Sequence, residues 1–205
     1  MVKQVLDNLK IAALNEMQNA SIEAAKKGAD IILLSPTGSG KTLAFLIPVL
    51  NKLSKDKPGI QAMILAPSRE LAIQIEQVFK QMGTGFKVNC CYGGHAMKIE
   101  KNNLQHPPAV LIGTPGRLVD HIKRGTIDPS TIETLVMDEF DKALEFGFEE
   151  DMSFIIGKLR NLKQRILTSA TYSLEIPAFT GIKNATELNY LSDKPVKGLK
   201  LKSVL

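Results

Sequence analysis

The residues from Ser35 to Thr42, in sequence SPTGSGKT, have the types and spacing that bind phosphate. They follow an apolar run, Ile31–Leu34, and precede a segment with helical spacing of apolar residues. This pattern predicts a buried strand, a glycine-rich turn and the start of a helix. Glycines in such a turn let backbone N–H groups point at an anion, and the helix dipole adds partial positive charge there. The segment therefore predicts a nucleotide-binding loop rather than a purely structural turn.

The end of this loop carries its specific chemistry. The ammonium group of Lys41 can reach the β- and γ-phosphates of a nucleotide, and the hydroxyl of Thr42 can ligate Mg²⁺. The strict pattern begins with glycine, so Ser35 is a departure from it. The candidate nucleotide-binding residues are Ser35, Pro36, Thr37, Gly38, Ser39, Gly40, Lys41 and Thr42.

A second apolar run, Thr134–Met137, leads into the acidic segment DEFD. A nucleotide-hydrolysing site needs a carboxylate at a strand end to hold Mg²⁺ through its water shell, and Asp138 suits that role. Glu139 is placed to polarise an attacking water. Acids are also favoured at helix starts for their effect on the dipole. Beside a phosphate loop, we prefer the catalytic interpretation.

The segment TSAT, Thr168–Thr171, directly follows the apolar residues RIL. Hydroxyl side chains at a strand end can hydrogen-bond the acidic segment and sense its state. The alternative is a simple turn of small residues. The catalytic interpretation depends on the position of this segment one strand after DEFD.

Apolar runs alternate with amphipathic segments along the chain. We expect strands at Ile31–Leu34, Ala62–Ala66, Lys87–Tyr92, Ala109–Ile112, Thr134–Met137 and Arg165–Thr168, with Thr186–Leu191 as a candidate last strand. We expect helices at Asn15–Lys27, Thr42–Leu53, Arg69–Met82, Ala96–Asn102, Gly116–Lys123 and Phe148–Leu159. This alternation predicts an α/β fold with a parallel sheet covered on both faces, which binds ligands beyond the carboxyl ends of its strands.

The composition fits one domain spanning residues 1–205. No apolar run approaches the ~20 residues of a membrane span, and the N-terminus has no signal-peptide core, so we expect a cytoplasmic protein without a membrane partner. The net charge of +5 permits nucleic-acid binding without demonstrating it. The adjacent thiols Cys90 and Cys91 predict buried strand residues rather than a disulfide or a zinc site.

The ordered segments SPTGSGKT, APSRELA, YGG, TPGR, DEFD and SAT resemble the first RecA-like domain of DEAD-box RNA helicases. The resemblance runs from about Asn15 to the 190s. It implies a RecA-like P-loop fold with a parallel β-sheet sandwiched between helices, ATP and Mg²⁺ as cofactors, and single-stranded or duplex RNA as partner. A DNA helicase of the wider DExD/H group and a catalytically silent nucleotide- or RNA-binding module stay as alternatives.

The resemblance also implies roles for individual residues. Lys41 contacts phosphate, Asp138 is the metal-linked acid and Glu139 the water-activating base. Ser169 and Thr171 couple hydrolysis to domain movement. Gln18, in LNEMQ, falls where the family reads the adenine edge, and its amide can both donate and accept. From the sequence alone, Gln18 also fits a polar residue on an exposed helix face.

Two predicted helix starts match segments that grip the RNA backbone in the family, and helix N-termini with hydroxyls suit phosphates. A glycine pair in YGG lets the backbone pass close to a strand. The simpler alternative for Arg69 is a surface pair with Glu70 or Asp120. The candidate RNA-binding residues are Pro67, Ser68, Arg69, Gly93, Gly94, Thr114, Pro115, Gly116 and Arg117.

The chain departs from the family pattern in two segments. Phe140 stands where DEAD has alanine, so its neighbours must make room for a ring. Leu14 and Asn15 replace the usual proline and hydroxyl residue, and no aromatic residue precedes Phe45 to stack on adenine. Apolar residues of the N-terminal segment 1–14 could cover the base instead, namely Val2, Val5 and Leu9.

The resemblance further implies a second RecA-like domain, whose arginines reach the γ-phosphate. No arginine follows the SAT segment, and residues 191–205 have the composition of a basic tail or linker. We therefore expect a monomeric domain that hydrolyses ATP very poorly alone and needs a second domain to act as a helicase.

Overall fold

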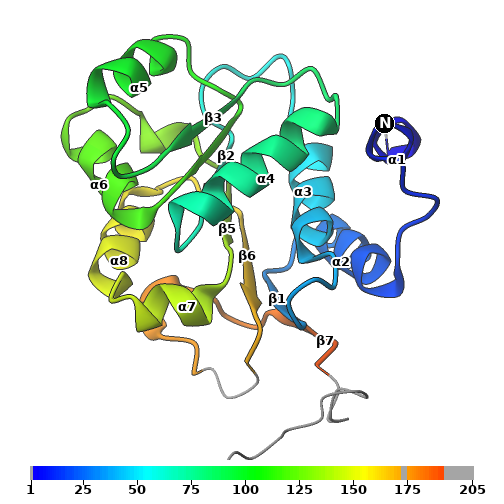
Figure 1. Ribbon diagram of the computed structural model, residues 1–205. Coiled ribbons are helices and arrows are strands. Elements are labelled where there is room, and N and C mark those ends of the chain that lie inside the picture. The colour runs from blue at the N-terminus through cyan, green and yellow to red at the C-terminus, as the bar shows by residue number, and fades with distance from the viewer. Residues whose placement is uncertain (1, 172–174, 192–205) are drawn as a thin grey trace, which may run out of the picture.

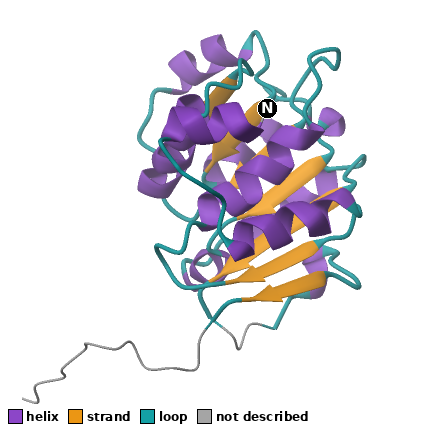
Figure 2. Ribbon diagram, turned by 90° about the vertical axis from the view of Figure 1, so that its right-hand side faces the viewer, coloured by secondary structure: helices purple, strands orange, loops and turns teal. Residues whose placement is uncertain are grey.

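The computed structural model describes residues 2–171 and 175–191. Its strands form one seven-stranded sheet in the order β3-β4-β2-β5-β6-β1-β7, and every neighbouring pair is parallel (Figures 1 and 2). The strands are β1 (Ile31–Leu34), β2 (Ala62–Leu65), β3 (Val88–Cys91), β4 (Val110–Gly113), β5 (Thr134–Met137), β6 (Gln164–Ser169) and β7 (Thr186–Asn189). The predicted α/β class and parallel sheet are confirmed.

Helices cover both faces of the sheet. Side chains alternate along each strand, so Ile64 of β2 packs into one apolar cluster while its neighbours Met63 and Leu65 pack into the other. The first cluster includes α1 (Val2–Leu9), α2 (Glu16–Lys26), α3 (Lys41–Lys52) and α4 (Arg69–Gln81). The second includes α5 (Met97–Leu104), α6 (Pro115–Lys123), α7 (Phe140–Glu145) and α8 (Glu149–Lys158). In Figure 1 α2 and α3 lie to the right of the sheet, and α6 and α8 to the left.

All seven expected strands and all six expected helices occur, with ends that differ by at most two residues. The candidate last strand is confirmed as β7, which pairs with β1. The structure also contains four elements that were not predicted, namely α1, α7 and two short 3₁₀ helices, Pro129–Thr131 and Ala178–Thr180. No helix within the described residues is long and apolar enough to cross a membrane. The proposed tail lies outside the described residues from position 192 onward.

The position of α1 corrects one expectation. Val5 is buried in the first apolar cluster, and Val2 and Leu9 pack against the same cluster. The side-chain amide of Asn8 donates to the backbone oxygen of Met82, directly after α4. Since α4 begins at the carboxyl edge of the sheet, its end lies at the opposite edge. These apolar residues therefore stabilise the core and do not cover a base beside the phosphate loop.

Candidate functional site

Three of the predicted segments meet at the carboxyl edge of the sheet. The phosphate loop follows β1, the acidic segment follows β5, and the SAT segment ends β6, the strand between them. In register, Leu34 of β1 pairs with Ser169 of β6, and Met137 of β5 pairs with Leu167 of β6. The backbone N–H of Ser35 donates to the oxygen of Ser169 at 3.1 Å. The fold thus brings together segments more than 120 residues apart in sequence.

The phosphate loop has the conformation that the sequence predicts. Gly38 and Gly40 have φ angles of +78° and +91°, which side-chain-bearing residues rarely adopt. Gly40 begins α3 without any side-chain cap, so the first N–H groups of the helix stay available to an anion. The ammonium group of buried Lys41 donates to the backbone oxygen of Ser35 at 2.7 Å. A bound phosphate would have to draw Lys41 away from this oxygen.

Gln18 lies against the phosphate loop rather than on an exposed helix face. Only 5% of the residue is exposed. Its Oε1 accepts from the backbone N–H of Asn15 at 2.9 Å, and its Nε2 donates to the oxygen of Gly40 at 3.2 Å. A Cβ at Gly40 would lie 2.7 Å from Nε2 of Gln18, so this packing needs glycine. The Nε2 end of the Gln18 amide thus contacts the loop, while the Oε1 end caps the start of α2.

The acidic segment is held from β6. Asp138 is 4% exposed, and burial raises the pKa of its carboxyl to about 6. Thr168 donates from Oγ1 to Oδ1 of Asp138 at 2.5 Å and accepts from the backbone N–H of Glu139 at 3.0 Å. Glu139 has φ +47° and ψ +52°, a left-handed conformation that costs on the order of 1 kcal/mol. The oxygen donors of Thr42 and Asp138 are the type that Mg²⁺ prefers.

The hydroxyl that contacts the acids is therefore that of Thr168, which the sequence analysis did not include among the site residues. Ser169 and Thr171 contact each other instead, because Oγ of Ser169 accepts from the backbone N–H of Thr171 at 3.1 Å. Thr168 could have been found only if the register of β5 and β6 had been known. Since Met137 pairs with Leu167, the next positions on these strands are Asp138 and Thr168.

Phe140, which stands where the family pattern has alanine, packs in the core directly after the two acids. Its side chain is fully buried in the second apolar cluster. Its ring packs on that of Phe179, in the 3₁₀ helix after β6, with 6.2 Å between ring centroids. The neighbours therefore make room for the ring, and Asp138 keeps its hydrogen bond to Thr168.

The candidate RNA-binding segments follow β2, β3 and β4, at the other half of the same edge. Ser68 caps α4 by accepting from the backbone N–H of Leu71 at 3.2 Å. Arg69 is exposed and pairs with Glu70 at 2.6 Å, as the simpler alternative predicted. Pro67 is buried. At this helix start, the exposed charges already pair with each other.

The glycine pair faces open space. A Cβ at Gly93 or Gly94 would meet no atom within 4 Å, and the φ of Gly94 is +88°. Thr114 begins α6 without a side-chain cap, and Pro115 and Gly116 form its first turn. The turn at Gly93 and Gly94 therefore leaves backbone groups beside open space, whereas a Cβ at Gly116 would lie 3.3 Å from a carboxylate oxygen of Asp151. Arg117 instead turns into the protein, where its Nε donates to Glu100 at 2.7 Å.

Comparisons with known proteins agree with this geometry. The model of the family "DEAD/DEAH box helicase" matches residues 15–178. The chain is 40% identical over 162 residues to ATP-dependent RNA helicase CshA of Limosilactobacillus reuteri, covering 78% of this chain and 33% of that protein. It is 37% identical over 173 residues to ATP-dependent RNA helicase DeaD of Escherichia coli K12, covering 83% of this chain and 28% of that protein.

Solved structures give the same result. A hypothetical ATP-dependent RNA helicase from Sulfolobus tokodaii superposes with a TM-score of 0.81 at 31% identity, over 92% of this chain and 57% of that one. A DEAD box protein from Methanococcus jannaschii gives a TM-score of 0.76 at 31% identity, over 84% and 48% of the two chains. The chain thus spans about a third of the length of the sequence relatives described above. By the family match across most of its residues, this chain belongs to the DEAD/DEAH box helicase family.

Proposed function

We propose that this chain is the ATP-binding domain of an ATP-dependent RNA helicase. It binds ATP with Mg²⁺ at the edge of β1, β6 and β5, and the backbone of single-stranded RNA at the edge of β2, β4 and β3. The observation that carries the proposal is the junction of three segments at one edge. There, Asp138 hydrogen-bonds Thr168 on the strand that also contacts the phosphate loop through Ser169.

In this proposal each residue of the site has a separate role. Lys41 and the N–H groups at the start of α3 bind the phosphates, and Thr42 and Asp138 would hold Mg²⁺, which neutralises phosphate charge. Glu139 polarises the attacking water. Gln18 holds the loop from the side, and reading adenine would require its Nε2 to leave the oxygen of Gly40.

In this proposal hydrolysis needs a second RecA-like domain, because an arginine supplied across the cleft contributes roughly 10³–10⁵ in rate in other nucleotide hydrolases. The relatives' greater length leaves room for such a domain. This chain alone is expected to bind nucleotide and to turn it over very slowly.

Calorimetric titration of residues 1–205 with ATP and Mg²⁺ tests the nucleotide part. We expect Lys41→Ala to weaken binding at least tenfold, which corresponds to about 1.4 kcal/mol. Lys3→Ala removes the same charge from an exposed position of α1 and should change nothing. Equal affinity in both variants would reject the loop as the nucleotide site.

Fluorescence anisotropy with labelled U12 and dT12 tests the RNA part. Preference for U12 supports an RNA enzyme, and equal binding supports the DNA alternative. In a longer protein with a second RecA-like domain, RNA should stimulate hydrolysis, and Glu139→Gln should abolish it. Nucleotide binding without any turnover in that protein would favour the silent module.

A further inference from the structure

One buried carboxylate connects two of the candidate RNA-binding segments. Glu100 of α5 is 2% exposed. Its Oε1 accepts from the backbone N–H of Tyr92 at 3.2 Å and lies 3.2 Å from Nδ1 of His95. Its Oε2 lies 2.7 Å from Nε of Arg117 and 2.7 Å from Nε2 of His121. Both oxygens are therefore fully occupied by groups from the loop after β3 and from α6.

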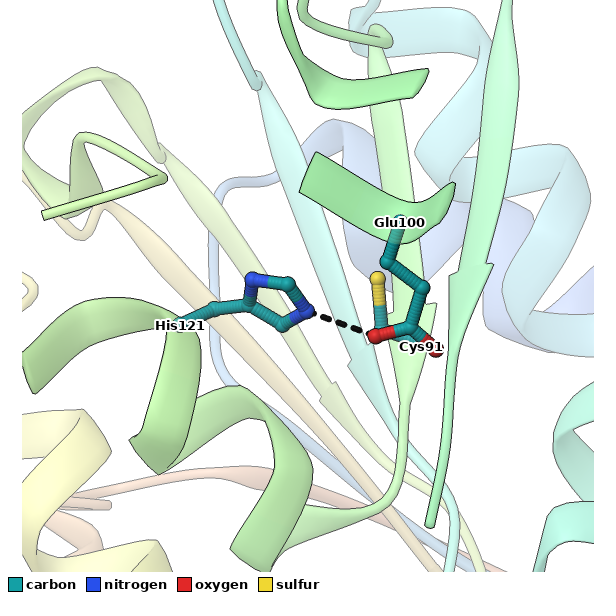
Figure 3. Close-up of side chains that lie close together, drawn as sticks. All are labelled: Cys91, Glu100 and His121. Carbon is teal, nitrogen blue, oxygen red and sulfur yellow. Dashed lines mark hydrogen bonds and ion pairs between the residues drawn. The ribbon is translucent and has the colours of Figure 1, made fainter. Parts of the chain in front are cut away.

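The partners keep this carboxylate ionised. Burial alone would raise the pKa of Glu100, but hydrogen bonds from His121, Arg117 and the Tyr92 backbone outweigh burial and lower it. His121 is itself fully buried, and its ring is fixed at Nδ1 by the Thr126 hydroxyl at 2.7 Å. Figure 3 shows His121 pointing from α6 toward Glu100. We call this buried cluster of Glu100, His95, Arg117 and His121 the joint. Because its groups bond one another away from solvent, it is more rigid than an exposed ion pair.

The joint fixes the loop after β3 against the start of α6. Nε of Arg117 donates to Glu100, and Nη2 of the same guanidinium donates to the backbone oxygen of His95. The backbone N–H of Thr114 donates to the oxygen of Cys91 at 3.1 Å. Only 13% of the Arg117 side chain is exposed. Its guanidinium therefore links the two segments instead of standing free for a phosphate.

We propose that Glu100 is a positioning residue for RNA binding, which sets the open glycine turn and the first turn of α6 as one phosphate-binding surface. The inference rests on the proposed function. Arg117 acts through the same joint, so the direct phosphate contacts come from the backbone N–H groups of Gly116 and Arg117 and from the open face beside Gly93 and Gly94. Pro115 has no N–H, and the N–H of Thr114 already donates to Cys91.

A metal site is the competing interpretation of this cluster. Cys91, Glu100 and His121 bring three ligand atoms within 4.8 Å of one another (Figure 3). However, the Arg117 guanidinium already occupies the carboxylate and would repel a cation. Burial, followed by the charge of Glu100, raises the pKa of the Cys91 thiol, and a thiolate is the form that binds metal. Closed zinc sites also need four ligands.

The test uses Glu100→Gln in residues 1–205, with anisotropy of labelled U12 as the readout. This change removes one negative charge, so bulk electrostatics alone would tighten binding to RNA. The joint predicts the opposite sign, because the new amide NH₂ faces the donors on Arg117 and His121. We expect at least tenfold weaker U12 binding with ATP affinity within twofold of wild type. Glu23→Gln, at an exposed position of α2, is the matched control and should not weaken binding.

Arg117→Lys gives a second test should Glu100→Gln unfold the domain. Lysine keeps the charge but cannot bond both Glu100 and the His95 oxygen. A direct phosphate contact predicts near-normal U12 binding, whereas the joint predicts at least tenfold loss. Unchanged or tighter binding in folded Glu100→Gln, or normal binding in Arg117→Lys, overturns the inference. Wild-type protein that binds ATP but not U12 would overturn the RNA proposal itself.

Discussion

The hydroxyl of Thr168 donates a 2.5 Å hydrogen bond to Oδ1 of Asp138 and accepts one from the backbone N–H of Glu139. One side chain on β6 thus holds both acids that follow β5. Because β6 also lies beside β1, a shift of this strand would act on the acids and on the phosphate loop together. Through Thr168, β6 is thus directly bonded to the acidic segment after β5.

Thr168→Val should remove both hydrogen bonds between β6 and the two acids while keeping the shape of the side chain. Asp138 loses a donor and the N–H of Glu139 loses its acceptor, both in a buried place, so we expect a loss of about 1–3 kcal/mol in the free energy of unfolding. Urea denaturation measures this loss. Thr134→Val, at the buried start of β5, is the matched control. Equal stability changes in the two variants would contradict a special role for Thr168.

Asp138→Asn should stabilise the domain at pH 8 while impairing Mg²⁺-dependent ATP binding. The folded pKa of about 6 lies above the ordinary 3.8, so ionisation disfavours the folded state. This penalty is absent below pH 3.8, grows between pH 3.8 and 6, and is complete above pH 6. At pH 8 the asparagine variant should gain ~1–3 kcal/mol.

Urea denaturation at pH 8 and pH 4.5 measures the difference between Asp138→Asn and wild type at each pH. The gain should shrink at the lower pH. Asp120→Asn, which removes a charge from the exposed face of α6, should show no such trend. A gain that is the same at both pH values would mean that Asp138 titrates like an ordinary surface acid.

Gln18→Ala should weaken ATP and GTP binding by a similar factor. Both ends of the Gln18 amide are bonded within the chain, so its loss loosens the phosphate loop whichever base is present. One lost hydrogen bond of about 1 kcal/mol corresponds to roughly fivefold in affinity. Competition calorimetry with both nucleotides measures it, and Asn19→Ala on the exposed side of α2 is the control. A loss confined to ATP would instead establish adenine reading.

The strands and the phosphate loop could be predicted because their signals are local. Ile31–Leu34 and Thr134–Met137 are continuous apolar runs that end at a turn or an acid. The joint at Glu100 could not be predicted in this way, because Glu100 lies in α5 while its partners lie in the loop after β3 and in α6, which meet only through the sheet order. For α1, the helical spacing of Val2, Val5 and Leu9 is a local signal of an apolar helix face. That spacing does not say whether the face covers a nucleotide base or packs on the core, and the structure shows core packing.

The position of Thr168 shows a different limit. Motif order drew attention to Ser169 and Thr171, while the contact itself depends on which face of β6 each side chain occupies. Ile166 and Val136 point into the first apolar cluster, and Thr168 and Asp138, two residues later on each strand, lie on that same face. Alternation combined with the order of β5 and β6 gives the pair, but that strand order is not visible in the sequence.

Phe140→Ala, which restores the usual family residue, should destabilise this chain. The Phe140 ring is fully buried against Phe179, and its removal leaves a cavity in the second apolar cluster. We expect a loss of about 3–5 kcal/mol in the free energy of unfolding by urea denaturation. Phe146→Ala is the matched control, because that ring is 59% exposed and should change stability by less than about 0.5 kcal/mol. The ring lies in the second apolar cluster, whereas α3, which begins at Lys41, packs in the first, so ATP affinity should survive in the folded fraction. A Phe140→Ala domain as stable as wild type would mean that the neighbouring 3₁₀ helix closes over the space, and that this ring is not required by the core.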